Sequence, residues 1–203
     1  MSDPDWAAYR QEAFGEPYLV WHDGPDFTEF ASRFDQDPAL ATRMLAAGVA
    51  EGDALAAQTP RELRLTDEQR AGFVRLLRDA LPRANAGVRL EAGASLFALT
   101  GDPEWSAPVV EVLGSAVFWG VRIDAAIRLK AFPPTPALVA AVAEAVRDPE
   151  YLVRYHSANT LLRWAGRTEE ISEDGELFGL LVDEAGPEGW ADVAGRLAAA
   201  VEP

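Results

Sequence analysis

The chain has 203 residues, 49% of them hydrophobic, and carries a formal net charge of −15 at pH 7. A chain of this length can bury a core of its own. Because it has no cysteine, disulfides, thiolate nucleophiles and cysteine metal sites are excluded. The strong acidity argues against nucleic acid as a partner, since affinity for phosphate comes mainly from Lys and Arg. Alanine occurs 37 times, and this richness favours helices.

Residues 1–25 carry too many large aromatic side chains for a disordered tail, namely Trp6, Tyr9, Phe14, Tyr18 and Trp21. We therefore expect this segment to pack on the helices that follow, or on a partner. The first residues carry acid where a signal peptide carries base, and no stretch reaches 18 uncharged apolar residues. These features predict a cytoplasmic protein with no membrane partner.

Helical patterns follow in chain order. Residues 26–34 and 38–57 form a first expected pair, and 66–80 begins with an N-capping box of Thr66 and Gln69. A helix over 105–117 follows the breaker Gly-Asp-Pro. The next, over 135–147, has Thr135 as N-cap and Pro136 at the first helical position. Residues 177–184 and 190–201 are expected to close the chain as a capping pair.

Three segments between these patterns align without gaps: VRLEAGASLFAL from Val88, VRIDAAIRLKAF from Val121 and VRYHSANTLLRW from Val153. In each, Arg follows the valine, small residues stand four and five positions on, and leucine stands eight positions on. Offsets 0, 4, 8 and 11 lie on one helical stripe, so each segment predicts a helix with one buried face. The small residues permit close approach of a neighbouring helix.

This pattern resembles the HEAT family, in particular the HEAT-like repeats of the PBS-lyase type. In that family an Asp precedes the second helix of each pair, which opens with Val-Arg, and the Asp and Arg brace successive turns. The same spacing of six occurs at Asp148 and Arg154 and at Asp37 and Arg43. The resemblance implies an all-α fold, an α-solenoid of about five antiparallel helix pairs, and binding to another macromolecule.

We expect three regions: an aromatic arm over 1–25 that packs on the array, a HEAT-like array over 26–166, and an acidic capping helix pair over 167–203. The charge balance is −7 over residues 1–40, zero over 41–166 and −8 over 167–203. Acid at both ends fits electrostatic steering of a cationic partner. It equally fits the polar outer face that terminal repeats need.

No catalytic motif is present, and we expect no catalytic residue, no metal site and no cofactor. His22 and His156 lack neighbours with metal-ligand spacing, and no GxSxG, P-loop or GxGxxG occurs. Within the HEAT-like family, the di-iron hydroxylases use repeated His-Glu dipeptides, which this chain lacks. The DNA glycosylases grip DNA in a basic cleft, which the neutral middle argues against. The acidic cluster at 169–176 is expected to be a solvated connector.

The exposed ridge of the repeated helices is predicted from offsets 3 and 7, which point away from the valine–leucine stripe. This ridge consists of Glu91, Ser95, Asp124, Arg128, His156 and Thr160, with Asn159 and Arg163 beside the last two. Together with Tyr155, all of these except Ser95 are expected on a protein-binding face. Trp119 follows Phe118 in the turn before Val121. It is either core filling or an interface anchor of the kind that dominates binding energy.

The sequence thus predicts a non-catalytic HEAT-like repeat protein that binds another protein, a basic one, through a concave surface flanked by acid. An immunity or inhibitor-type protein is the narrower version of this hypothesis. The alternative implied by the resemblance is a HEAT-like lyase or a carrier that holds a small molecule between helices. It requires a deep pocket on which Tyr155, His156 or Arg163 converge. The oligomeric state stays open.

Overall fold

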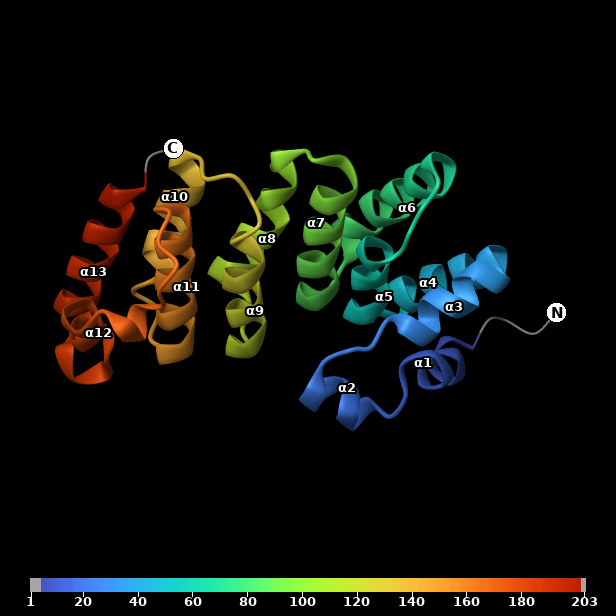
Figure 1. Cartoon of the computed structure of the whole chain (residues 1–203), viewed down its shortest axis with the longest axis horizontal. Coiled ribbons are helices and arrows are strands. Elements are labelled where there is room, and N and C mark those ends of the chain that lie inside the picture. Colours follow the sequence, from blue (N-terminus) through green and yellow to red (C-terminus); the bar gives the residue numbers. More distant parts are fainter. Residues whose placement is uncertain (1–4, 202–203) are drawn as a thin grey trace. The chain divides into compact units, whose positions relative to one another are not determined.

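The computed structural model describes residues 5–201, apart from the side chains of Leu19, Trp21, Asp23 and Asp183. Over these residues all regular structure is helical and no strand occurs, which confirms the all-α prediction. The chain divides into two compact units, unit 1 (Met1–Gly101) and unit 2 (Asp102–Pro203), so the division falls inside the predicted array (Figure 1). Between residues 5 and 201, every helix is too short or too polar to cross a membrane.

Unit 1 contains seven α-helices and two short 3-10 helices among the described residues: α1 (Trp6–Phe14), α2 (Pro17–Asp23), α3 (Thr28–Gln36), α4 (Pro38–Glu51), α5 (Ala54–Gln58), η1 (Thr59–Glu62), α6 (Asp67–Ala80), η2 (Leu81–Arg83) and α7 (Ala86–Thr100). Helix α4 packs on α6, and α5 packs on α7. The capping box of Thr66 and Gln69 begins α6 as predicted.

The single helix predicted over 38–57 is wrong, because the chain turns at Gly52. This glycine has φ +87°, a left-handed conformation that other residues adopt at a cost, and it ends α4. The Asp53 carboxylate then accepts a hydrogen bond from the Leu55 N–H and begins α5. Two helices therefore stand where the periodicity alone indicated one.

Helix α1 packs on α3 and α4. The Trp6 indole is buried and donates to Asp53 over 2.8 Å. It lies over Gly48, where a Cβ would come within 2.5 Å of the ring. The Tyr9 and Phe14 rings pack against Phe30 at centroid distances of 5.9 and 5.2 Å. The predicted contribution of Trp21 lies outside the described side chains.

Unit 2 contains, in chain order, η3 (Pro103–Trp105), α8 (Ser106–Ser115), α9 (Trp119–Leu129), α10 (Pro136–Ala145), α11 (Tyr151–Trp164), η4 (Ile171–Glu173), α12 (Gly175–Leu181), η5 (Asp183–Ala185) and α13 (Gly186–Ala200). Helix α9 packs on α8 and α11, and α10 packs on α8, α11 and α13. As predicted, Thr135 caps α10 and Pro136 is its first residue. Helix α9 begins two residues before the predicted start, at Trp119.

The buried stripe of the three aligned segments is confirmed. The leucines at offset 8, Leu96, Leu129 and Leu161, are completely buried. Ala92, Ala125 and Ser157 at offset 4 are also completely buried. At offset 11, the Trp164 indole donates to the Phe132 carbonyl over 3.0 Å and so ties α11 to the end of α9. The periodicity therefore identified the core face correctly in both units.

Candidate functional site

The arginine that follows each repeat valine holds the turn before its own helix. Arg89, Arg122 and Arg154 donate to the carbonyls of Ala84, Ala116 and Asp148, respectively, over 3.2, 2.8 and 2.8 Å. Each bond thus spans five or six residues back along the chain. The Val-Arg dipeptide therefore has the same structural role in all three segments.

The Asp148 carboxylate links two of these segments. It accepts two hydrogen bonds of 3.0 Å from the Arg122 guanidinium, in the bidentate geometry that makes such pairs strong. Arg154 follows Asp148 by six residues, as in the family pattern, but it bonds to the Asp148 backbone carbonyl and not to the carboxylate. The Arg154 side chain is completely buried, with its guanidinium 3.9 Å from the centre of the Trp190 ring. At the other matching position Asp37 caps α4 through the Leu40 N–H, and Arg43 is exposed.

The predicted exposed ridge is wrong for four of its residues, because Glu91, Ser95, Asn159 and Thr160 are buried. Each repeated helix is covered on two sides, by its own partner and by a helix of the adjoining segment. The Thr160 hydroxyl donates to the Ala126 carbonyl of α9 over 2.7 Å, and the Ser95 hydroxyl at the same offset donates to Ala57 of α5 over 2.8 Å. In α7 and α11, the hydroxyl at offset 7 therefore bonds to the backbone of a neighbouring helix.

Glu91 forms a buried ion pair with Arg61 from η1. The Arg61 Nη1 lies 2.6 Å from the Glu91 carboxylate, and both side chains are almost excluded from solvent. Taking two charges out of water is expensive, and removal of one partner leaves the other buried and uncompensated. Glu91 therefore contributes to the interior of unit 1 and is not available on a binding surface.

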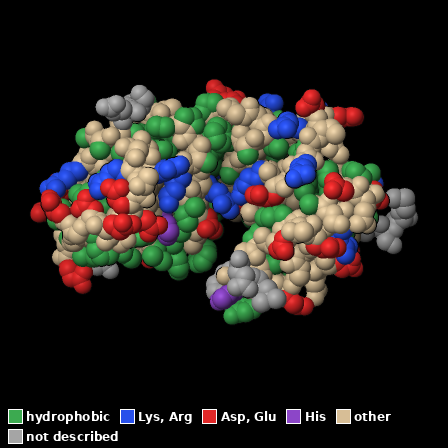
Figure 2. Space-filling model, viewed as in Figure 1, with side chains coloured by type: hydrophobic (Ala, Val, Ile, Leu, Met, Phe, Trp, Pro, Cys, Tyr) green, Lys and Arg blue, Asp and Glu red, His purple; other side chains and the backbone are tan. Residues whose placement is uncertain are grey.

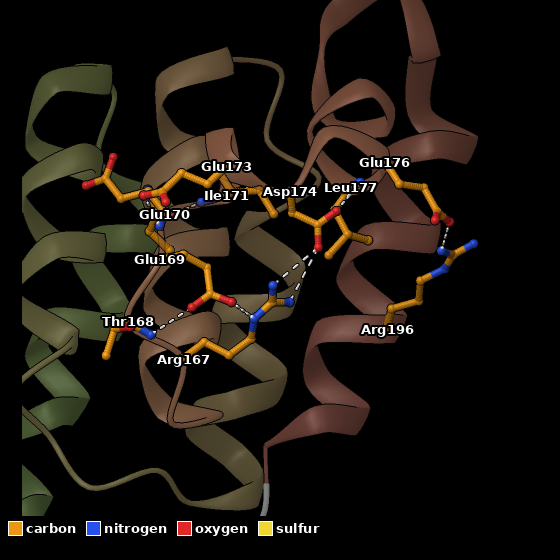
Figure 3. A network of polar contacts seen from close by, with 11 residues as sticks. Arg167, Thr168, Glu169, Glu170, Ile171, Glu173, Asp174, Glu176, Leu177 and Arg196 are labelled. Carbon is orange, nitrogen blue, oxygen red and sulfur yellow. Dashed lines mark hydrogen bonds and ion pairs between the residues drawn. The ribbon is translucent and has the colours of Figure 1, made fainter.

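The acidic segment from Arg167 to Glu176 connects α11 to α12, and its five acidic side chains are exposed or half-exposed, as predicted. Its backbone is in addition folded against α11 (Figure 3). The Asn159 side-chain oxygen accepts from the Ile171 N–H over 2.7 Å, and the Ile171 side chain is completely buried. The Tyr155 hydroxyl donates to Glu170 over 2.6 Å. Tyr155 and Asn159 thus hold this segment, while the Glu170 and Glu173 side chains remain exposed.

Arg167 neutralises part of the same segment. It bonds to Glu169 over 2.6 Å and lies 3.4 Å from Asp174 (Figure 3). The pKa of Glu169 is lowered, chiefly by hydrogen bonds from its own backbone N–H and from Arg167. The carboxylates of Glu170 and Glu173 take part instead in a reciprocal capping arrangement at η4.

His156 is half-buried on α11, beside Tyr155. Burial lowers its pKa, the positive charge of Lys130 lowers it further, and Glu170 acts in the opposite direction. The imidazole is therefore neutral at neutral pH. Of the other predicted residues, Asp124 and Arg163 are exposed and Arg128 is half-buried, all in unit 2.

An apolar patch lies at the start of α9 and α11. It consists of four exposed side chains, Val117 (98% exposed), Phe118 (63%), Trp119 (42%) and Leu152 (42%). The core-filling alternative for Trp119 is therefore wrong. The Phe118 and Trp119 rings lie 5.5 Å apart. Thr160 bonds to Ala126, and Trp164, which lies further along the chain than Thr160, bonds to Phe132, which lies further along than Ala126. Helices α9 and α11 therefore point in the same direction, and their starts lie at the same end.

The sequence pattern predicts no binding role for Phe118 or Leu152 and places Val117 inside a helix. One sequence signal could have identified Phe118, because it stands three residues before the repeat valine, at the N-cap position of its helix. At the equivalent position Asn85 caps α7 through the Val88 N–H, whereas Phe118 makes no side-chain cap. An apolar residue at a position that favours Asn, Asp, Ser or Thr breaks a local rule.

Shallow hollows lie elsewhere on the units. In unit 1, one of about 440 Å³ is lined by parts of α4 and α6 and by the Arg83–Asn85 turn. In unit 2, one of about 420 Å³ is lined by Val110, Ala141 and Pro149, among others. Tyr155, His156 and Arg163 line neither of them. Among the described residues, no three His, Asp or Glu side chains are grouped so that they could hold a metal ion.

No model of a known protein family matches the chain, and comparison with curated proteins and with solved structures found no match either.

Proposed function

We propose that the chain is a non-catalytic α-solenoid of HEAT-like repeats that binds another protein, and that unit 2 carries the binding surface. The observation that carries this proposal is the apolar patch. Two adjacent aromatic rings stand exposed on a turn, and large aromatic side chains supply much of the energy at protein interfaces. A scattered apolar side chain would need no such explanation, but four at one end of two packed helices do.

The contacts within each unit support a repeat architecture. The three Val-Arg arginines hold equivalent turns, and Ser95 and Thr160 bond to the preceding repeat at the same offset. In unit 2 the first helices α8 and α10 pack on each other, as do the second helices α9 and α11. Stacked repeats of this kind form extended binding surfaces.

The side chains expected in a carrier pocket support the protein-binding function over the ligand-carrier alternative. Of the three side chains named for that pocket, Tyr155 has its hydroxyl bonded to Glu170, and Arg163 is exposed. Tyr155, His156 and Arg163 line neither of the hollows described above. A partner that is itself an enzyme would make the chain an inhibitor or immunity-type protein.

The test is affinity capture from a lysate of the source cells with the tagged protein, compared with the double variant Phe118→Ala/Trp119→Ala. A matched control is Tyr18→Ala, which removes a side chain that is 66% exposed in unit 1. We expect a protein retained by the parent chain and by Tyr18→Ala but lost from the double variant. Retention of the same proteins by all three chains would overturn the proposal, and so would an empty column.

A further inference from the structure

We infer that the apolar patch and the exposed acids beside it form one docking surface for a basic protein, which covers Phe118 and Trp119 with an apolar face and places its cations against the acids. This inference rests on the proposed function and specifies the chemistry of the partner. We name Glu150, Glu170 and Glu173 the acidic rim; all three side chains are exposed.

The patch and the acidic rim are continuous through the first two turns of α11. Glu150 immediately precedes the helix, and Leu152 of the patch lies in its first turn. Tyr155 lies one turn further, with its ring 6.0 Å from that of Tyr151, and its hydroxyl bonds to Glu170. Figure 2 shows hydrophobic side chains along the lower edge of unit 2, bordered by acidic ones.

Two arginines that follow the starts of α9 and α11 are already engaged in the fold. Arg122 is held by the Asp148 carboxylate, and Arg154 is completely buried. Unit 2 as a whole has 17 acidic and 8 basic side chains between residues 102 and 203. A second copy of the chain would bring the same acidic rim to the contact, so like charges would oppose it. A basic partner instead gains from electrostatic steering.

The surface is formed in advance of binding. A Cβ at Gly120 would lie 2.7 Å from the Phe118 ring, so the absence of a side chain at Gly120 lets this ring rest on the start of α9. The acidic rim is held in turn by the bonds of Asn159 and Tyr155. A surface that is already ordered loses less conformational entropy on binding, which favours affinity.

The direct test uses a defined probe, a short amphipathic peptide of Leu and Lys that presents an apolar helical face flanked by lysines. The comparison probe has the same pattern with Glu in place of Lys. Binding is measured by titration calorimetry, and the contact is located from backbone and indole NMR shifts. We expect the Leu/Lys peptide to bind and to shift the Trp119 indole. Affinity should fall when salt rises from about 0.01 M to about 1 M, because the Debye length shortens from about 30 to about 3 Å.

Three variants distinguish what the Trp119 anchor, the acidic rim and the missing side chain at Gly120 each contribute to peptide binding. Trp119→Ala should weaken the peptide at least about tenfold, as expected for an interface anchor. Glu170→Gln/Glu173→Gln should remove most of the salt dependence. Gly120→Ala should keep the helical circular dichroism while it displaces the Phe118 ring and weakens binding several-fold. Tyr18→Ala and the charge control Glu184→Gln, an exposed acid of unit 2, should leave the affinity unchanged.

Equal binding of the Leu/Glu peptide, salt-independent binding, or a dimer that Trp119→Ala dissociates would overturn the inference. These outcomes differ from failure of the proposed function. If lysate capture depends on Phe118 and Trp119 but is insensitive to salt, the chain binds a protein whose chemistry is not basic. If capture does not depend on the patch at all, the proposed function itself fails.

Discussion

Units 1 and 2 build equivalent helices differently at two equivalent positions. Three residues before the repeat valine, Asn85 caps α7 and also donates to the Gly52 carbonyl, whereas Phe118 leaves α9 without a side-chain cap and exposes its ring. At offset 3, Glu91 of unit 1 pairs with Arg61 in the interior, whereas His156 of unit 2 lies close to Lys130. In unit 1 the side chains at these positions stabilise the fold through bonds, whereas in unit 2 they are exposed or half-buried.

The difference indicates where function lies. A side-chain N-cap contributes about 1 kcal/mol to helix stability, and α9 forgoes it at the turn that displays Phe118 and Trp119. Departures from local rules of this kind tend to mark functional sites.

The largest effect is expected for the buried ion pair of unit 1. Glu91→Gln leaves the largely buried Arg61 guanidinium with one carboxylate partner, the more exposed Glu62 at 3.2 Å, so we expect the free energy of unfolding to fall by about 3 kcal/mol. His156→Gln at the equivalent position of unit 2 should cost less than about 1 kcal/mol. Chemical denaturation of both variants measures the difference. Equal losses would show that the two positions do not differ as described.

The buried stripe of α11 should be far more sensitive to truncation than the apolar patch on the same helix. Leu161→Ala removes a completely buried side chain and should cost about 2–5 kcal/mol. Leu152→Ala, the same substitution on the same helix, removes an exposed side chain and should cost about 0.5 kcal/mol or less. Leu152→Ala should nevertheless weaken the Leu/Lys peptide. A large loss of stability in this control would mean that Leu152 belongs to the core.

The side-chain hydroxyls at offset 7, those of Ser95 and Thr160, should contribute about equally to the free energy of unfolding. Ser95→Ala and Thr160→Val each remove a hydrogen bond to a backbone carbonyl of the preceding repeat, and each should lower stability by about 1 kcal/mol. Urea titrations of the two single variants provide the comparison. A neutral result at one position and a loss at the other would break the equivalence of the two repeats.

The sequence predicted the helical periodicity and its core face, since one buried stripe leaves a regular pattern of valine and leucine. It also predicted the caps at Thr66 and Thr135, because capping depends on residues a few positions apart. It failed for Glu91 and Thr160, because periodicity reveals one contact face and a stacked helix has a second. The bond from Asn159 to the Ile171 N–H joins a side chain to a distant backbone group, for which no local pattern exists.

The smallest effect concerns pH. The pKa of His156 is lower in the folded chain than its ordinary value of 6.5, through burial and Lys130, so the unfolded chain binds this proton more readily. Stability should therefore fall as the pH drops below about 7, and level off only below the folded pKa. Denaturation at several pH values between about 5 and 8 measures this slope. His156→Gln should flatten the slope, and an unchanged slope would assign it to other groups.

If the turn before α9 serves binding rather than folding, Phe118→Asn, which places in unit 2 the cap that Asn85 provides in unit 1, should separate the two properties. The decisive measurement is titration of this variant with the Leu/Lys peptide, after denaturation has confirmed its stability. We expect the stability to be unchanged or higher, by up to about 1 kcal/mol, and the affinity to fall severalfold or more. Full affinity in a folded Phe118→Asn variant would contradict this expectation.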